Sequence, residues 1–467
     1  MEAETRMHQG RCSFPIIDGD RFLDRLAGLE QVIRPDDIQQ ALEATGRVNS
    51  RACTLTHEVT LWVVLAMGLF TDLPISQVYK HARRLRKGEK TPHRSSLCVA
   101  RQRLGVDPLR QLFAQTVRPL ANPHTKGAFY GSYRLMGIDS TVLDVPDTPA
   151  NAVAFGRSSG SRGDGVFPQI RKLSLVELGT HVEVAMSIGP VHCSEQKMVS
   201  DVLPYVTPDM LLLVDRGFYS CEFWRELDSM KVKLLARVIN HVALAPLRYL
   251  SDGSYLTKIY RNQYDRKKDR DGVWVRVIRY TLDDPQRVGH GEVHTIITNL
   301  LDEKLHPAEE LIILYHERWE HELVYDEQKT HQDPRRATKP SHLRSETPAG
   351  VKQELYALSL GHFVIRSLMF SAAESVDIDP DRLSFTGCFQ ILKCRLPECD
   401  GLTAQSIAAW YEALLWEMQS ERTDPRRNRI NPRVIKRKIS KWNKKRPVHL
   451  RQPPLKKTFR ETIVMTH

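Results

Sequence analysis

The stretch Leu311–Gln332, LIILYHERWEHELVYDEQKTHQ, constrains this chain most, because it predicts one helix with a single polar face. Tyr315, Arg318, Glu322 and Lys329 follow one another at intervals of three, four and seven residues. At about 100° per residue, these four side chains fan over an arc of about 60°. One face of the helix therefore carries a carboxylate, two cations and a phenol.

Such a helix has two interpretations. A solvated charged helix held by i,i+4 pairs is the more common meaning of such a run, although its charges need not align. Here Glu317, Glu320 and Glu327 point away from the polar face, and Asp326 lies close to it as a rival carboxylate. The other interpretation is a reactive face, because a carboxylate binds hard divalent cations while Arg, Lys and Tyr donate to phosphate oxygens.

Two upstream segments each predict a buried strand that carries an acid near its end. Tyr133–Asp144, YRLMGIDSTVLD, contains Asp139, and Met210–Ser220, MLLLVDRGFYS, contains Asp215. Each aspartate alone is equally compatible with capping of the following turn. With Glu322, however, three acids are available to hold two cations roughly 3.5–4 Å apart, an arrangement suited to in-line displacement at phosphorus.

With these motifs together, the chain resembles bacterial insertion-sequence transposases of the DDE type, specifically the insertion-sequence-4 group. That group has a Tyr-x-x-Arg-x-x-x-Glu-x-x-x-x-x-x-Lys signature, which this sequence matches without a gap. The resemblance covers roughly residues 21–373. Further runs that carry it are GIDSTVLDVPDTPANAVAFG from Gly137, SEQKMVSDVL from Ser194 and LLLVDRGFYS from Leu211.

The resemblance implies an RNase-H-like fold and an enzyme that cuts and rejoins DNA at the ends of its own element. It also implies two Mg²⁺ ions per site, with Mn²⁺ as a substitute, a hairpin intermediate, and a homodimer on paired element ends that acts on target DNA. His321 and the pair His316–Glu317 are more polar than is usual for the group. The implied catalytic and metal-binding residues are Asp139, Asp215 and Glu322, and the implied phosphate-binding residues are Tyr315, Arg318 and Lys329.

At 467 residues the chain is too long for one ordinary core. The fold class expected is α/β, with an RNase-H-like mixed sheet, flanking helices and a β-rich insertion. The expected divisions are a helical DNA-end-binding domain at 1–128, a catalytic domain at 129–375 interrupted by a β insertion at 240–300, a helical region at 376–424 and a basic, disordered tail at 425–467.

The first division reads as short helices over Thr54–Thr71, Ile75–Leu85 and Ser95–Leu104. Arg83 and Arg84 lie at the end of the second helix and are candidate DNA contacts, as in a helix-turn-helix. A helical bundle with an ordinary cationic surface is equally compatible with the sequence.

From about Phe129 strands and helices alternate, which favours a mixed sheet flanked by helices. The Gly/Ser run GRSSGSRGDG from Gly156 lacks the Walker spacing and its lysine, so it is interpreted as a mobile loop. Its Arg157 and Arg162 are candidate DNA contacts. The expected segments are strands at 133–139, 172–178, 182–188, 211–215 and 233–238, and helices at 194–205 and 221–230.

Between Asp215 and Glu322 lie more residues than one crossover helix needs, and residues 240–300 fill the excess. The runs YLTKIYRNQY, VWVRVIRYTL and VHTIITNL predict strands, with Asp271–Gly272 as a hairpin turn. Trp274 is a candidate wedge against a flipped base, although an aromatic residue in a strand more often serves packing.

The charge is concentrated at the C-terminal end. The chain carries +12 overall, but residues 422–467 alone hold sixteen Lys or Arg and two acids, so the remainder is −2. Four prolines and few large apolar residues in its central run predict disorder. We expect this tail to bind phosphates independently of sequence, with Trp442 stacking on a base; a solubilising tail is the alternative.

The opening MEAETRMHQGRC is polar, so no signal peptide is expected, and the run near Leu61–Phe70 is too short to span a bilayer. Reduced cysteines in a bacterial cytoplasmic, nucleoid-associated protein that binds no membrane are the expectation. Two alternatives to a transposase stay open. One is a decayed relic that only binds DNA, and the other is a nuclease without strand transfer.

Overall fold

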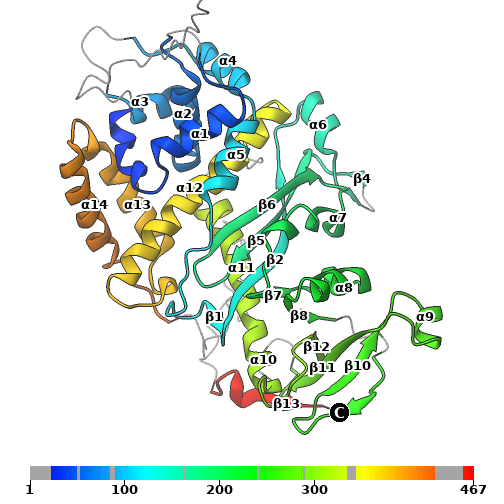
Figure 1. Cartoon of the computed structure of the whole chain (residues 1–467). Coiled ribbons are helices and arrows are strands. Elements are labelled where there is room, and N and C mark those ends of the chain that lie inside the picture. The colour runs from blue at the N-terminus through cyan, green and yellow to red at the C-terminus, as the bar shows by residue number, and fades with distance from the viewer. Residues whose placement is uncertain are drawn as a thin grey trace, which may run out of the picture.

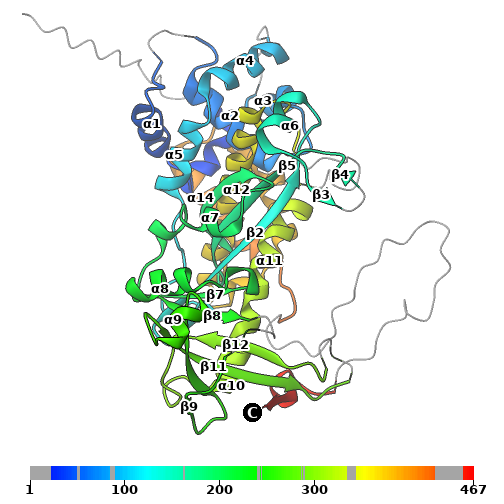
Figure 2. The same ribbon diagram turned by 90° about the vertical axis from the view of Figure 1, so that its right-hand side faces the viewer.

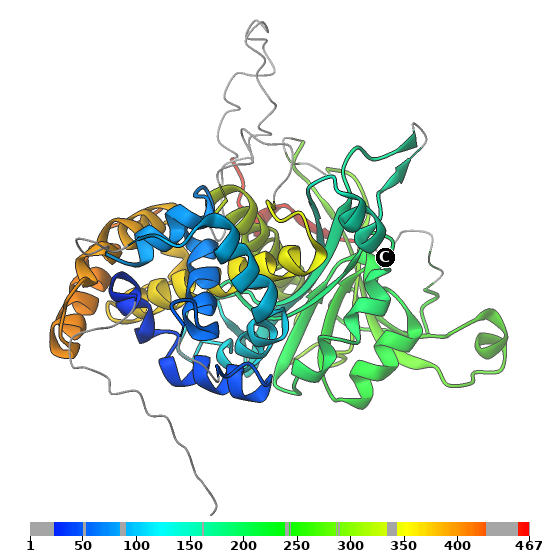
Figure 3. The same ribbon diagram turned by 90° about the horizontal axis from the view of Figure 1, so that it is seen from above.

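The structure is a computed structural model, and it describes residues 23–49, 53–84, 90–160, 163–238, 242, 244–285, 287, 290–333, 343–425 and 456–466. Helices from the N-terminal part of the chain and from residues 348–418 gather on one side of the molecule, and a long twisted sheet extends on the other (Figures 1 and 3).

The first half of the sheet is built around β2, which spans Tyr133–Asp144. The strand expected to end near Asp139 continues to Asp144, so Asp139 lies within it, because β5 pairs with β2 along this whole length. On one side of β2 lies a strand antiparallel to it, followed by a strand antiparallel to that one. On the other side lie two strands parallel to β2. Numbered along the chain, their spatial order is 3-2-1-4-5. The expected RNase-H-like mixed sheet is confirmed. These strands are β5 (Gln169–Glu177), β6 (Val182–Pro190), β7 (Met210–Val214) and β8 (Lys233–Arg237).

The expected β insertion continues the same sheet, because β12 pairs antiparallel with β8. The expected turn at Asp271–Gly272 is wrong. Ile259 pairs with Val273, so the connection is the whole segment 260–272, which contains a short helix. Asp271 has φ of 54°, so it closes a longer loop rather than a two-residue turn. The elements are β9 (Arg248–Tyr249), β10 (Tyr255–Ile259), α9 (Gln263–Lys267), β11 (Val273–Leu282) and β12 (His294–Thr298).

The last described residues, 456–466, differ from the disordered tail expected at 425–467. The turn Arg460–Thr462 leads into strand β13 (Ile463–Met465), which pairs with β11. Arg460 also forms ion pairs of 2.9 and 2.8 Å with Glu309 and Glu310. The apolar run at the end of the tail supplies a strand, and the charge average over the whole tail concealed it. Residues 426–455, including Trp442, lie outside the described residues.

The helical side combines the N-terminal helices with helices from beyond the sheet. α2 (His57–Leu69) packs on the 27-residue α12 (Pro348–Glu374), and a Cβ on Gly68 would lie 2.0 Å from the Ala357 carbonyl oxygen. Only glycine allows this backbone approach. The others are η1 (Asp24–Gln31), α1 (Pro35–Ala44), α3 (Ile75–Ala82), α4 (Arg94–Leu104), α5 (Asp107–Thr116), α13 (Phe385–Arg395) and α14 (Ala404–Met418).

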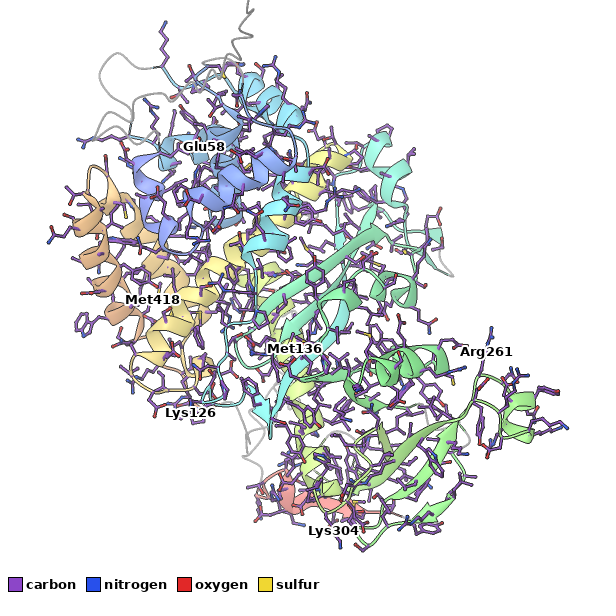
Figure 4. The ribbon with its side chains drawn as sticks, viewed as in Figure 1. Glu58, Lys126, Met136, Arg261, Lys304 and Met418 are labelled. Carbon is purple, nitrogen blue, oxygen red and sulfur yellow. The ribbon has the colours of Figure 1, made fainter. Side chains whose placement is uncertain are left out.

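By length and hydropathy α12 is able to cross a membrane, but 83% of its apolar window is buried inside the protein. It serves as the central core helix between the N-terminal helices and the sheet (Figure 1). Met136 on β2, fully buried, marks the sheet side of this core (Figure 4).

Short elements complete the sheet edges and the connections. β1 (Phe129–Tyr130) pairs with β2, and α6 (Pro149–Phe155) precedes a small hairpin of β3 (Ser159–Gly160) and β4 (Gly163–Asp164) in the expected Gly/Ser loop. The expected helix 194–205 is a short α7 (Glu195–Val199) followed by a 3-10 turn, and α8 (Cys221–Ser229) matches expectation. α8 and the predicted polar helix lie on opposite faces of the sheet (Figure 2).

Candidate active site

Strands β2 and β7 bring Asp139 and Asp215 to one edge of the sheet. Their parallel register ends with Ile138 beside Val214. Asp139 is the next residue of β2, and Asp215 is the first residue after β7. Side chains alternate across a strand, so Leu135, Gly137 and Asp139 face the same side of the sheet. Asp215 accepts a 2.7 Å hydrogen bond from the backbone N–H of Arg216, and Asp139 accepts one of 2.7 Å from Ser140.

The predicted polar helix is a rod with two irregular turns. It comprises α10 (Ala308–Tyr315), a 3-10 turn (His316–Arg318), α11 (Trp319–Asp326) and a π turn (Glu327–His331). Despite these irregularities, Tyr315, Arg318 and Lys329 contact β2 or β7, and Glu322 pairs with Arg318. The signature residues therefore lie on the face that their spacing predicts, although the rod is not one uniform helix.

Two phenols attach this rod to the strands that carry the aspartates. The Tyr315 hydroxyl donates to the carbonyl of Val214 at 3.2 Å, one residue before Asp215. The Tyr325 hydroxyl donates to the carbonyl of Asp139 at 2.7 Å. Sequence reasoning missed Tyr325, whose only signal is its position on the same rod. Each tyrosine fixes the rod against one acid-bearing strand. These two hydrogen bonds therefore set how far Glu322 lies from each strand.

Arg318 lies among the three acids. Its Nη1 is 3.5 Å from Asp139 Oδ2, and its Nη2 donates to Glu322 Oε1 at 3.2 Å. Burial lowers the pKa of Arg318, but Tyr315 and the carboxylates of Asp215, Asp139 and Glu322 outweigh burial and raise it. A single guanidinium thus partly neutralises a triad of carboxylates drawn from β2, β7 and α11.

Burial raises the pKa of Asp139 to about 6, and the Ser140 N–H and Arg318 oppose that rise. The negative charges of Glu195 and Asp215 raise it further. A carboxylate held in a desolvated site among other carboxylates is stabilised by a bound cation. Three hard oxygen donors of this kind fit a divalent cation such as Mg²⁺.

Lys329 is engaged with the same strand. Its ammonium donates to the hydroxyl of Thr141 and, at 3.0 Å, to the carbonyl of Val142. In this structure Lys329 and Tyr315 both support the helix against the sheet, and Arg318 is the signature cation in direct contact with the acids. Their phosphate-binding roles stay predictions.

The rival carboxylate Asp326 is exposed, and its Oδ2 lies 3.3 Å from His331 Nε2. His321, the polar departure in the signature helix, is fully buried against Gly137, where a Cβ would lie 2.8 Å from its Nδ1. Neither ring nitrogen has a hydrogen-bond partner among the described residues, and burial lowers the pKa of His321 to about 3. This histidine is neutral and fills the place of an apolar side chain.

A second polar cluster lies on the buried side of the same rod and is separate from the triad. His181 contacts Glu320 at 2.9 Å, Asp381 at 3.3 Å and Glu327 at 3.0 Å, and Glu327 also pairs with Arg366. Burial and Arg366 lower the pKa of His181, but the carboxylates outweigh them and raise it to about 9. The three carboxylates favour a protonated imidazole although Arg366 also contacts Nδ1, and the cluster anchors the rod to the β5–β6 turn and to α12.

The candidate DNA contacts are scattered. Arg84 is exposed and lies 3.6 Å from Asp400, whereas Arg83 is half-buried after α3. Arg157 pairs with Asp147 and thereby holds the Gly/Ser loop. Trp274 is 44% exposed on β11, with the Lys258 ammonium 5.0 Å from its ring. Arg162 and Trp442 lie outside the described residues.

Comparisons with known proteins identify the family of this chain. The insertion element 4 transposase N-terminal model matches residues 23–114, and the transposase DDE domain model matches residues 130–360. The chain is 27% identical over 448 residues to the transposase InsG for insertion sequence element IS4 of Escherichia coli K12, covering 93% of this chain and 98% of that one.

Among solved structures, the chain is similar to a cryo-EM structure of the piggyBac transposase synaptic complex with hairpin DNA. The sequence identity is 11% and the TM-score is 0.42, over 84% of this chain and 85% of that one. The two family models, the acid-bearing strands and the complete signature helix together show that this chain belongs to the insertion-sequence-4 family of DDE transposases, enzymes that cut DNA and transfer its strands.

Proposed function

We propose that the chain excises and inserts its own element through Asp139, Asp215 and Glu322, which bind two Mg²⁺ ions. Members of this family depend on divalent metal. The observation that carries the proposal is the convergence of these three carboxylates on Arg318. When bound, the cations lower the pKa of the attacking water and stabilise the leaving oxygen.

Each step is an in-line transfer at phosphorus. A water oxygen attacks the phosphodiester at the element end, the P–O3′ bond breaks, and the 3′-OH of that strand is freed. That hydroxyl then attacks a target phosphodiester, forms a new P–O bond and displaces a target 3′-oxygen. Because both steps have the same geometry, one set of three carboxylates serves both.

In this proposal Arg318 and Lys329 hold the phosphates of the element end, and Tyr315 also contacts phosphate. The pair distances of Arg318 support this role, because its guanidinium already bridges two acids that the metals would neutralise. A guanidinium released from a carboxylate presents paired donors that match two phosphate oxygens.

The enzyme requires further DNA contacts, since members of this family act on DNA. We propose that residues 1–128 bind the element ends, with Arg83 and Arg84 as contacts, and that the basic residues of 425–467, with Trp442, bind phosphates. Arg157, Arg162 and Trp274 are further candidates. The domain boundaries, a homodimer on paired ends, and a nucleoid-associated place in a bacterial cytoplasm without membrane binding belong to the same proposal.

The decisive experiment is cleavage of DNA that carries the element's own flanking ends, with Mg²⁺ or Mn²⁺. It compares wild type with Glu322→Gln and with Asp326→Asn, a neighbouring exposed acid that serves as the matched control. We expect wild type and Asp326→Asn to cut and Glu322→Gln to lose cleavage. Loss of cleavage in Asp326→Asn alone would mean that the helix register is wrong.

Two other outcomes would favour the alternatives. If wild type binds ends but does not cut them, the chain is a DNA-binding relic. If it cuts ends but joins none of them to target DNA, it is a nuclease. For the tail, log affinity should fall against log salt by about 0.9 per phosphate neutralised. A truncation at Thr423 with an unchanged slope would remove the tail from the DNA interface.

A further inference from the structure

Glu195 is a fourth carboxylate beside the two strand aspartates. It is the first residue of α7, in the chain between β6 and β7, and the hydroxyl of Ser194 caps that helix. Its side chain is 30% exposed. Sequence reasoning placed Glu195 within a family-like run but assigned it no role.

One oxygen of this carboxylate is held in a fixed position. Oε1 accepts from the hydroxyl of Ser140, the residue that follows Asp139, and lies 3.3 Å from Arg171 Nη1. The same Nη1 donates to the Ser140 hydroxyl at 3.1 Å, and Arg171 Nη2 donates to the Val191 carbonyl at 3.1 Å. This network ties Glu195 to β2 next to the first aspartate.

The other oxygen points to the second aspartate's turn. A Cβ built on Gly217 would lie 3.1 Å from Glu195 Oε2, and Gly217 is an exposed residue two positions after Asp215. The Glu195 carboxylate therefore extends from the residue after Asp139 to the turn after Asp215. Glycine at position 217 leaves the space beside Oε2 free of a side chain.

The two sides of the sheet thus each supply an acid to this edge. Ser140 alternates with Asp139 along β2, so its side chain and Glu195 lie on the face opposite to Glu322. Glu322 approaches the aspartates from α11, and Glu195 approaches them from α7. Hard divalent cations take six or more oxygen ligands, several of them usually waters, so a further carboxylate beside the site is able to bind the cation directly or through one of these waters.

We propose that Glu195 is a fourth acidic residue of the metal site, contributing Oε2 to a divalent cation directly or through a bound water. The inference rests on the proposed function of Asp139, Asp215 and Glu322. The competing explanation is an ion pair with Arg171 that only braces β2 against β5. That pair uses Oε1 alone and leaves Oε2 available to a cation.

The test measures metal binding by the full-length protein without DNA. Mn²⁺ titrations followed by the melting temperature, and Tb³⁺ luminescence, compare wild type with Glu195→Gln and Asp139→Asn. Glu222→Gln is the matched control, because Glu222 lies in the first turn of α8 and pairs only with the exposed Arg261 among the contacts that the structure gives it. We expect the half-saturating Mn²⁺ concentration to rise about 10–100-fold in Glu195→Gln and to stay unchanged in Glu222→Gln.

The outcomes distinguish the role of Glu195 from the metal site of the three proposed ligands. Equal Mn²⁺ dependence in wild type and Glu195→Gln, with a loss in Asp139→Asn, overturns the inference and leaves the proposed function standing. No change in either variant rejects the metal site itself. If Glu195→Gln does not fold, Glu195→Asp keeps the charge beside Arg171 but withdraws the carboxylate. Weaker Mn²⁺ binding is expected there, and wild-type binding would contradict the role of Oε2.

Discussion

The guanidinium of Arg318 lies 3.5 Å from the carboxylate of Asp139, across the contact between the signature helix and the central strand. The same guanidinium bonds Glu322, so one cation stands between two of the three acids. In this arrangement Arg318 offsets the mutual repulsion of the carboxylates when no metal is bound. The signature arginine therefore has a structural role besides its proposed contact with phosphate.

Arg318→Gln should destabilise the metal-free protein by about 1.5–3 kcal/mol, the typical worth of hydrogen bonds to charged groups. The carboxylates would then repel each other without a counter-charge, so Mn²⁺ should stabilise this variant more than it stabilises wild type. Chemical denaturation with EDTA and with Mn²⁺ measures both effects. A variant as stable as wild type in EDTA would show that Arg318 does not offset the acids.

Asp139→Asn should stabilise the metal-free protein above pH 6. Burial raises the pKa of Asp139 from 3.8 to about 6, so the folded state disfavours the charged carboxylate there. Ionisation of Asp139 destabilises the wild-type fold increasingly as pH rises from 3.8 to about 6, by up to about 3 kcal/mol. Below pH 4 both side chains are neutral and the difference should vanish. Denaturation at pH 4 and pH 8 checks the sign, and a stabilising effect equal at both values would contradict the burial argument.

The stability of the fold should fall as pH rises from about 6.5 to 9. The carboxylates around His181 raise its folded pKa from 6.5 to about 9. Protonation of His181 therefore stabilises the fold fully below the unfolded pKa of 6.5, and this stabilisation is lost above the folded pKa. The loss should be on the order of 3 kcal/mol. Unfolding free energies of wild type and His181→Gln across this window measure it. A slope that persists in the variant would assign the titration elsewhere.

His321→Leu should stabilise the protein by about 1–3 kcal/mol, because it removes two buried ring nitrogens that lack hydrogen-bond partners. His331→Leu is the control, since His331 lies on the same rod but is exposed beside Asp326. Melting temperatures of the two variants at pH 7 make the comparison. Destabilisation by His321→Leu would mean that the imidazole has a polar partner.

Lys329→Met should reduce end cleavage by more than tenfold while it removes about 0.5–1.5 kcal/mol of stability. The stability loss follows from the bonds of Lys329 to Thr141 and Val142, and the methionine keeps the aliphatic packing. Cleavage assays at a temperature well below unfolding separate the two effects. Unaltered cleavage would limit Lys329 to a structural role.

The sequence alone determined the face of the signature helix, because 3.6-residue periodicity is a local property that survives one 3-10 turn and one π turn. It also determined β7 and the first part of β2 with their acids, since short apolar runs depend on local burial, but not the continuation of β2 beyond Asp139, which follows from its pairing with β5. The β insertion was predictable for the same reason, but its hairpin connection was not. A turn motif such as Asp271–Gly272 fixes a hairpin only when the strands end beside it, and here they end at Ile259 and Val273.

Only the tertiary structure decided how distant residues meet. The position of Arg318 between Asp139 and Glu322, the phenol bonds of Tyr325 and the pairing of β13 with β11 all depend on strand order. Glu195 lies 56 positions after Asp139 in the chain. It nevertheless contacts Ser140, the neighbour of Asp139, because β5, β6 and α7 fold back beside β2. Sequence patterns report neighbours within one turn or one strand, whereas this site is assembled from chain segments that only packing brings together.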